Sequence, residues 1–276
     1  MINYGDLDLD ANITEGYLTA FIREELTKAG FHRVVLGLSG GLDSATVAYL
    51  SVKALGKENV IAAVMPYKSS NMENIKDADK IISVLDIKRH HFDITSIVDP
   101  YFEKFRDADN TRRGNMMARA RMCVLYDLSK MENALVIGTS NKTEILLGYG
   151  TIFGDLASAI NPLGDLYKTQ VKLLAKHLGV LDKIITKAPS ADLFVGQTDE
   201  SDYGFTYSEA DKLLYLLVDE RCTPAQCEKL GFDKKFIDLV IAKIIKNQFK
   251  RSTPIIAKLS NRTIGIDFRY PRDWET

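Results

Sequence analysis

Short apolar runs alternate along the chain with longer segments whose apolar residues recur at helical spacing. Residues 34–39, 60–66 and 134–140 are short runs of the kind that forms buried parallel strands, and a weaker run near 89–94 predicts one more strand. Apolar residues spaced three or four apart predict helices in the intervening segments. The predicted helices cover residues 13–29, 44–55, about 72–85, about 115–129 and about 166–178.

This alternation predicts an α/β fold, a doubly wound parallel sheet of about five strands with helices on both faces. The 276 residues contain no repeat and no Pro/Gly/Ser-rich linker. We therefore predict a single domain over residues 1–276, with a helical C-terminal extension over about 205–276. Ligands of such sheets bind beyond the carboxyl ends of the strands. We expect the site just after Leu38, Val64 and Ile137.

Charge and composition narrow the class of protein. The chain has 36 Lys and Arg residues against 37 Asp and Glu, which lacks the basic excess of a dedicated nucleic-acid-binding protein. No apolar run approaches the roughly 18 residues of a membrane-spanning helix, and the acidic N-terminus does not resemble a secretion signal. Three cysteines without a CxxC pair suit a reducing compartment. We expect a cytoplasmic protein that binds neither nucleic acid nor membrane.

The motif SGGLDS, residues 39–44, directly follows the first predicted strand and opens a helix. Its two glycines allow a tight turn that presents backbone N–H groups, and the helix N-terminus favours phosphate. Ser39 and Ser44 can donate to phosphate oxygens, whereas Asp43 would repel phosphate unless a cation such as Mg²⁺ lay between them. The motif therefore predicts a site for a metal–pyrophosphate complex. The alternative is an ordinary glycine-rich turn.

SGGLDS resembles the phosphate-binding loop of the PP-loop ATP pyrophosphatases, which cleave ATP between its α and β phosphates. Two further blocks resemble the corresponding stretches of NAD synthetases. They are GTSNKTEILLGYGTIFGDLASAINPLGDLYKTQVKLLAKHLGV at residues 138–180 and APSADLFVGQTDESDYGFTY at residues 188–207. The resemblance runs from about residue 13 to 251 and implies an ammonia-dependent NAD synthetase.

The resemblance implies a site for Mg²⁺ and ATP. Asp43 and Glu144 would bind the metal, and Asp43 and Lys168 would be the catalytic residues, with Lys168 neutralising phosphate charge. The residues implied to bind ATP are Gly37, Leu38, Ser39, Gly40, Gly41, Leu42, Asp43, Ser44, Thr139, Lys168 and Ser190.

Plain structural roles stay open for several of these residues. Glu144 could cap the helix or turn that follows it, and Lys168 could be a solvated lysine near a helix start. Arg119, implied to hold the dinucleotide, could belong to a solvated face of its helix, and Cys123 is expected to pack in the same helix. The other arginines of that face would be Arg112, Arg113 and Arg121.

The dinucleotide side departs from the family pattern. Arg119 and Lys250 are implied to bind deamido-NAD. Many family members carry lysine and aspartate where this chain has Ile152 and Ala159, and a His–Lys pair where it has Phe249 and Lys250. We therefore expect the dinucleotide contacts to be rebuilt from other residues, or partly supplied by a second subunit of the homodimer that the family forms.

The resemblance also implies the reaction. The nicotinate carboxylate of deamido-NAD would attack the α-phosphorus of ATP, releasing pyrophosphate, and ammonia would then displace AMP from the acyl-adenylate to give NAD. A glutaminase would need an activated cysteine or a further domain, and neither is visible. The expected donor is therefore free ammonia or ammonia from another protein. Asp199 and Glu200 are candidate bases for this step.

Two other functions stay open. The chain could be another PP-loop amidating or thiolating enzyme, such as a GMP synthetase-like enzyme, although thiolation usually brings paired cysteines. It could also be a non-catalytic nucleotide-binding module, although a pure binder has less need of two acids near phosphate. We further expect residues 68–74 and 196–204 to be mobile and to lie where a lid would close, with plain surface loops as the alternative.

Overall fold

Four parallel strands form one sheet in the computed structural model, which describes residues 7–190, 199, 203–252, 254–264 and 266. Their order is β3-β2-β1-β4, so β1 lies at the centre with β2 and β4 beside it. The predicted α/β fold is confirmed, but the described residues contain four strands rather than about five. The strands are β1 (Val34–Gly37), β2 (Val60–Val64), β3 (Lys88–His91) and β4 (Leu135–Val136).

A fifth strand is reduced to one residue. Ile160 forms an isolated parallel bridge with Ile137 beyond the end of β4, and its carbonyl accepts from Gly138 N at 2.7 Å. The predicted strand over 134–140 is accordingly shorter than expected: β4 covers Leu135–Val136, and Ile137 N makes a last bond to the carbonyl of Val35 in β1 at 3.1 Å.

The helices follow the predicted order, with additions. The predicted helix over 72–85 is reproduced as α3, whereas α4 and most of the short helices have no sequence prediction. The helices are α1 (Ala11–Lys28), α2 (Leu42–Leu55), α3 (Met72–Leu85), α4 (Thr95–Glu103), α5 (Asn110–Glu132), α6 (Lys142–Leu147), α7 (Lys168–Leu178), α8 (Asp182–Thr186), α10 (Tyr207–Leu214), α11 (Pro224–Lys229) and α12 (Lys234–Lys246), with shorter turns η2 (Lys57–Asn59), η3 (Tyr215–Asp219) and η4 (Gln248–Lys250).

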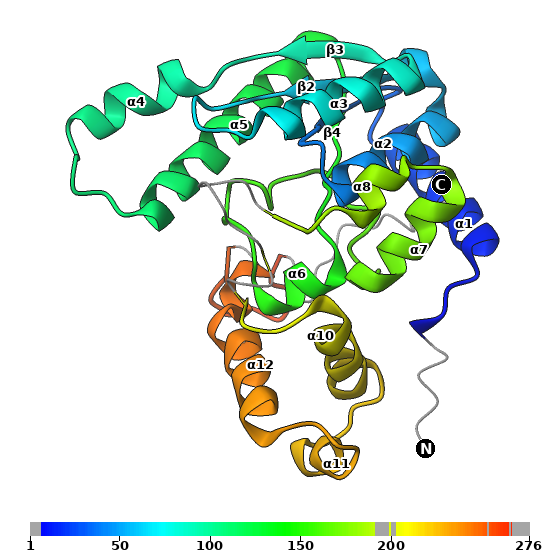
Figure 1. Ribbon diagram of the computed structural model, residues 1–276, viewed down its shortest axis with the longest axis vertical. Helices are drawn as coiled ribbons and strands as arrows, with labels where there is room; N and C mark the ends of the chain where they lie inside the picture. The colour runs from blue at the N-terminus through cyan, green and yellow to red at the C-terminus, as the bar shows by residue number, and fades with distance from the viewer. Residues whose placement is uncertain (1–6, 191–198, 200–202, 253, 265, 267–276) are drawn as a thin grey trace.

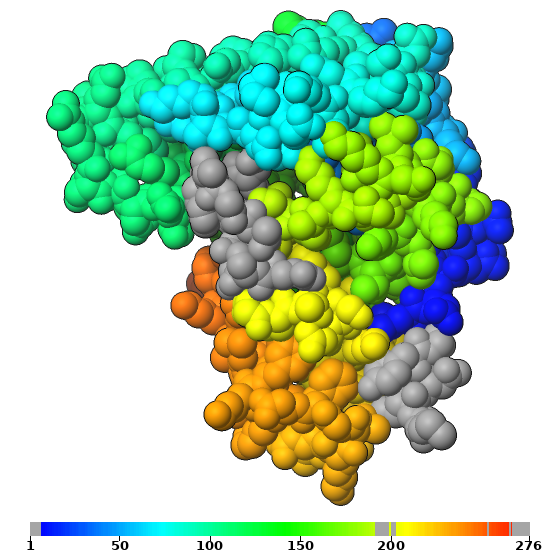
Figure 2. Space-filling view, in the orientation of Figure 1, coloured from blue at the N-terminus to red at the C-terminus, as the bar shows by residue number. Residues whose placement is uncertain are grey.

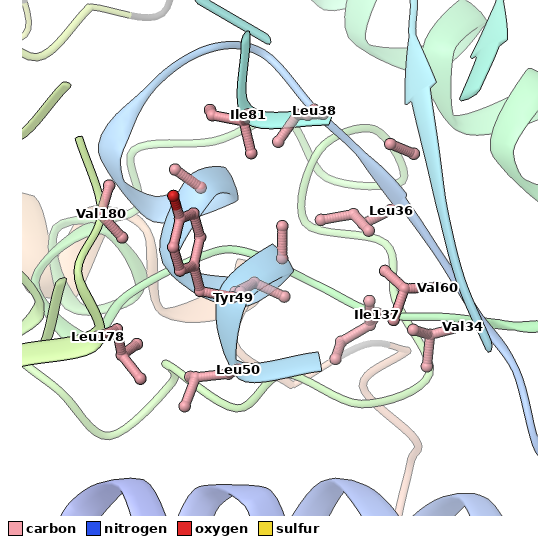
Figure 3. Close-up of a cluster of buried hydrophobic side chains, with 14 of the residues drawn as sticks. Val34, Leu36, Leu38, Tyr49, Leu50, Val60, Ile81, Ile137, Leu178 and Val180 are labelled. Atoms are coloured by element: carbon pink, nitrogen blue, oxygen red, sulfur yellow. The ribbon is translucent and has the colours of Figure 1, made fainter. Parts of the chain in front are cut away.

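Alternate residues of the central strand enter different cores. Val34 and Leu36 pack with residues of α1, α2 and α7 (Figure 3), whereas Val35 packs with residues of α4 and α5. Successive side chains of a strand point to opposite faces of the sheet, so this division places helices on both faces. Figure 1 shows the resulting layers. Among the described residues, no helix has the length and apolar character needed to span a bilayer.

The helices that follow residue 206 form a third apolar cluster beyond the end of the sheet. Leu213, Leu214 and Val240 pack there with Leu147 of α6 and Tyr167, which directly precedes α7. Figures 1 and 2 show α10, α11 and α12 as the lower part of the molecule, and Figure 1 shows α6 between them and the sheet. These helices therefore pack against α6 and the start of α7, which lie at the carboxyl ends of the strands.

Candidate active site

The turn between β1 and α2 has the geometry of an anion-binding loop. Gly40 has φ +77°, and a Cβ atom there would lie 2.1 Å from the carbonyl oxygen of Asn74, so the close approach of α3 requires glycine. Gly41 is the N-cap residue of α2, and no described side chain caps this helix. The backbone N–H groups of its first turn are therefore available to an anion.

Two serine hydroxyls close this loop. Ser44 Oγ accepts from Ser39 N at 3.3 Å, lies 3.1 Å from Ser39 Oγ and donates to the carbonyl of Gly41 at 3.2 Å. Hydroxyl groups can rotate to meet a new partner, so both serines can turn to a bound anion without a change in the backbone.

Three charged side chains from three helices meet beside the loop. Asp43 lies in the first turn of α2, Glu144 in the first turn of α6, and Lys168 is the first residue of α7. The Lys168 ammonium donates to Asp43 Oδ2 and, at 3.1 Å, to Glu144 Oε1. The side chain of Lys168 is only 7% exposed, so it is not the solvated lysine of the structural alternative.

Glu144 also caps α6, as the structural alternative proposed. Its backbone N–H donates to Asn141 Oδ1 at 3.0 Å, and its Oε2 lies 3.5 Å from Asn141 N, which together form a capping box. Asn141 Nδ2 in turn donates to Asp43 Oδ1 at 3.1 Å. The cap therefore does not compete with a role in the site, because it orients the carboxylate toward Lys168.

Burial and charge set the protonation of this cluster. Burial raises the pKa of Glu144 to about 7; the Lys168 charge opposes this shift, and the charges of Asp43 and Asp199 add to it. Burial would lower the pKa of Lys168, but the neighbouring Asp43 and Glu144 outweigh it and raise that pKa overall. Lys168 therefore stays protonated at neutral pH. The cluster offers a fixed cation and two carboxylates beside an open helix N-terminus, an arrangement suited to a metal-bound polyphosphate.

Comparison with known proteins identifies the family. A sequence model described as NAD synthase matches residues 15–254, which is most of the chain. The chain belongs to the NAD synthase family. It is 52% identical over 274 residues to the NH(3)-dependent NAD(+) synthetase of Chlorobium phaeobacteroides, and the match covers 99% of both chains. The resemblance inferred from sequence is thereby confirmed.

Solved structures of the family share the fold. The NH3-dependent NAD synthetase of Campylobacter jejuni is 37% identical, with a TM-score of 0.77, and the match covers 91% of this chain and all of that one. The NMN synthetase of Francisella tularensis is 31% identical, with a TM-score of 0.81, and the match covers 92% of this chain and all of that one. These two structures of similar fold are thus named for two different products, NAD and NMN.

Outside the loop and the cluster of charged side chains, the residues implied to bind ATP are Thr139 and Ser190. Thr139 is half-buried and follows Gly138, just past the point where β4 leaves β1. Ser190 is exposed and directly precedes residues 191–198, which lie outside the described residues. Their roles stay predictions.

The two residues assigned to the dinucleotide both contact one loop. Arg119 on α5 is exposed and donates to the carbonyl of Ile152 at 3.3 Å. Lys250 donates to the carbonyls of Gly148 and Gly150, each at 2.8 Å. The two side chains therefore hold the loop that follows α6 from two sides. Whether they also bind substrate stays a prediction.

A small cavity adjoins this loop. It has a volume of about 180 Å³ and is lined by Ser140, Ile145, Leu156, Asn161, Lys250 and Arg251. Ile152 is half-buried, while Ala159 and Phe249 are exposed. The residues that depart from the family pattern therefore present no charged group to hold a dinucleotide, and the cationic side chains that line the cavity are Lys250 and Arg251.

A larger cavity of about 310 Å³ lies between β3 and α5, and its lining contains none of the predicted site residues. Cys123 lines it and is exposed, so the expectation that it packs within its helix was wrong. The turn of the helix carries Cys123 outward, whereas Met117, Ala120 and Leu128 face the sheet. We assign the chemistry to Asp43, Glu144 and Lys168, which we call the acid–lysine cluster, rather than to this larger cavity.

Sequence reasoning missed the residues that surround the cluster. Both oxygens of Asp199, a candidate base by sequence, accept tyrosine hydroxyls, from Tyr149 and Tyr207, each at 2.9 Å. Burial raises the pKa of Asp199, against the effect of Lys168, and the ring of Tyr207 lies 5.1 Å from the Lys168 ammonium. Glu200 lies outside the described residues. Among the described neighbours of the cluster, only Asn141 had a sequence signal, because the N-x-x-E spacing of Asn141 and Glu144 is typical of a helix cap.

The two predicted loops have different outcomes. Over residues 68–74, α3 already begins at Met72, and Lys68 is tied down by its contact with Asp99 and by the bond from its N–H to Thr95 Oγ1 at 2.9 Å. This segment is therefore a bonded turn and a helix start. Of residues 196–204, only 199, 203 and 204 are described, so that prediction lies largely outside the described residues.

Proposed function

We propose that this chain joins ammonia to the nicotinate carboxylate of deamido-NAD with ATP as the energy source, forming NAD, AMP and pyrophosphate. Family membership and the near full-length match to an NH(3)-dependent NAD(+) synthetase support this activity. The observation that carries the proposal is the meeting of Asp43, Glu144 and Lys168 beside the uncapped start of α2.

Adenylation solves the chemical problem of the reaction. A carboxylate does not accept ammonia, because its leaving group would be oxide; an acyl-adenylate has AMP as a good leaving group. The nucleophile of the first step is already an anion, so no base is needed there. The task of the protein is to align the carboxylate with the α-phosphorus and to stabilise charge on the departing pyrophosphate. The α2 N–H groups and the Lys168 ammonium supply that stabilisation.

The acid pair fits a divalent cation. Asp43 and Glu144 offer carboxylate oxygens, which are the ligands that Mg²⁺ prefers, and the described residues contain no cluster of three or more metal-binding side chains. Mg²⁺ bound there would neutralise charge on the phosphate chain and orient it. Lys168 bonds both acids with two of its three N–H donors, so the third can donate to a phosphate oxygen when ATP binds.

Ammonia is the proposed nitrogen donor. The chain covers 99% of its Chlorobium relative, whose name specifies NH(3), and the free cysteines are scattered as Cys123, Cys222 and Cys227. Asp199 lies beside the cluster and has both oxygens bonded to tyrosines, so it can accept a proton only by giving up one of these bonds. We therefore assign no base from among the described residues.

A homodimer is part of this proposal. Tyr126 and Met131 on α5 are 42% and 59% exposed, so this long helix offers apolar surface to a second copy. A second subunit could also supply the dinucleotide contacts that Ile152 and Ala159 do not. Light scattering during size exclusion tests the assembly: a dimer mass supports it, and a monomer mass at micromolar concentration contradicts it.

One assay tests the function. Purified protein receives deamido-NAD, ammonium chloride and Mg-ATP, and chromatography identifies every product. We expect NAD, AMP and pyrophosphate in equal amounts, and no product when ammonium is omitted or replaced by glutamine. ADP and orthophosphate would contradict the proposed bond cleavage. A parallel reaction with nicotinic acid mononucleotide tests the substrate, because turnover of the mononucleotide alone would contradict deamido-NAD.

A further inference from the structure

A buried carboxylate outside the acid–lysine cluster contacts two of the helices that build it. Asp211 lies on α10 and is fully buried. Its Oδ1 accepts from Thr143 Oγ1 at 2.6 Å, and its Oδ2 accepts from the backbone N–H of Thr169 at 2.8 Å. Thr143 belongs to α6 and Thr169 to α7, so one carboxylate connects three helices.

Thr143 extends this contact to Lys168. Its hydroxyl is fully buried, donates to Asp211 and accepts from the backbone N–H of Lys168 at 3.0 Å. Asp211 and Thr143 thereby satisfy the first two N–H groups of α7. A helix has four such unpaired N–H groups at its start, and here the acceptors come from other elements rather than from the helix itself.

The bonded residues are the sequence neighbours of the catalytic cluster. Thr143 directly precedes Glu144, and the Lys168 backbone that it holds carries the ammonium that pairs with Asp43 and Glu144. We infer that Asp211 is a positioning residue, which sets the separation of Lys168 and Glu144 through Thr143. This inference rests on the proposed function and deepens it by adding a residue from the C-terminal helices.

The contact places one donor on each oxygen of the Asp211 side chain. Both of its partners donate, one hydroxyl and one backbone N–H, so both oxygens must accept. An amide at this position has only one oxygen, and its NH₂ group would face one of the two donors. Asp211→Asn therefore preserves size and loses one bond, which displaces Thr143 or the start of α7.

The test compares Asp211→Asn with two partners and a matched control. Misplacement of catalytic groups by about 1 Å can cost on the order of 100-fold, so we expect kcat to fall about 10–100-fold in Asp211→Asn and in Thr143→Val. Thr143→Ser, which keeps the hydroxyl, should retain near wild-type kcat. The control is Leu216→Ala, which cuts a fully buried side chain from the same apolar cluster. We expect it to lower the melting temperature at least as much while leaving kcat unchanged at a temperature where all variants are folded.

The double variant decides between positioning and simple support. If Asp211 acts through Thr143, Asp211→Asn with Thr143→Val should lose no more kcat than the worse single variant. Additive losses, or losses that follow the melting temperature across all variants including Leu216→Ala, would overturn the inference. Should Asp211→Asn fail to fold, Thr143→Val against Thr143→Ser makes the same distinction.

A binding measurement separates this inference from the proposed reaction. Calorimetric titration with Mg-ATP alone needs no amidation, so it reports on the cluster even if the dinucleotide is not the substrate. We expect Asp211→Asn and Thr143→Val to weaken Mg-ATP binding about tenfold, as expected for a lost charge-assisted contact, and Leu216→Ala to leave it unchanged. Equal affinity in all four proteins would overturn the positioning role, whereas an inactive wild type that binds Mg-ATP would overturn only the reaction.

Discussion

The phosphate side of the site and its dinucleotide side are assembled in different ways. On the phosphate side, Asp43, Glu144 and Lys168 come from three helix starts and bond one another. On the proposed dinucleotide side, Arg119 and Lys250 of the described chain donate to backbone carbonyls of one loop. A charged cluster that is complete before ligands arrive suits the invariant part of the reaction, the handling of ATP. A side held together through a loop can change its substrate contacts without disturbing that chemistry.

Removing an acid from the phosphate side should have the largest effect. Asp43→Asn deletes a charge that would hold the metal, so we expect turnover to fall by at least about 100-fold, the scale seen when one electrostatic group is lost. Pyrophosphate release measures it. Asp86→Asn, an exposed carboxylate at the end of α3, is the matched control and should leave turnover unchanged. Substantial activity in Asp43→Asn would contradict the view that the phosphate side carries the chemistry while the dinucleotide side serves binding.

Removing the lysine should separate metal binding from catalysis. Lys168→Met leaves Asp43 and Glu144 without their cation, so we expect turnover to fall about 100-fold while Mn²⁺ alone binds more tightly. Calorimetric titration with MnCl₂ measures the affinity, and the product assay measures turnover. Weaker Mn²⁺ binding would show that the lysine does not compete with a metal for these acids.

The phosphate side should respond to pH. Because the pKa of Glu144 is raised to about 7, its carboxyl group is mostly protonated at pH 6 and mostly ionised at pH 8. A metal ligand must be deprotonated, so we expect Mn²⁺ affinity to fall about tenfold as the pH drops from 8 to 6. Glu144→Gln should bind more weakly at both values and lose most of this dependence. The same slope in Glu144→Gln would assign the titration to another group.

On the dinucleotide side, Arg119 should affect one substrate only. Arg119→Ala removes an exposed guanidinium, so we expect KM for deamido-NAD to rise about fivefold, as for a loss of uniform binding, with KM for ATP and kcat unchanged. Arg112→Ala, on the same helix, is the control. An equal rise in both KM values would indicate that the loop held by Arg119 supports the phosphate side as well.

Lys250 should give the smallest effect on turnover and a measurable effect on folding. Lys250→Met leaves the carbonyls of Gly148 and Gly150 without their donor, so we expect the free energy of unfolding to fall by about 1–2 kcal/mol. Thermal unfolding measures this, with the exposed Lys246→Met as control. An unchanged melting temperature together with a large rise in KM for deamido-NAD would make Lys250 a substrate contact instead.

Local patterns predicted the parts of the molecule that short stretches of chain determine. The apolar run before SGGLDS and the helix after it place Asp43 directly, and the family resemblance paired it with Glu144 and Lys168 before any contact was known. The strand predicted near residues 89–94 begins one residue and ends three residues later than β3 (Lys88–His91), because the exposed residues of this edge strand carry no apolar alternation. The missing fifth strand has a different cause: Ile160 lies in the irregular segment between α6 and α7, and pairing stops after one residue.

Contacts between distant elements could not be predicted in this way. Asp211 is 68 residues from Thr143 and 42 from Thr169, and an aspartate in an amphipathic helix normally faces water. Only the packing of α10 against α6 and α7 buries it. Lys250 is a second example. The family resemblance implies that it binds substrate, whereas in the structure its ammonium donates to the carbonyls of Gly148 and Gly150.

The ion pairs of Lys168 have a consequence for the empty enzyme. Two acids held close together in a buried setting would repel each other if nothing balanced them, and the polypeptide supplies its own counterion from α7. The charge of the two acids is therefore balanced within the polypeptide itself, so Asp43, Glu144 and Lys168 can keep their arrangement between turnovers.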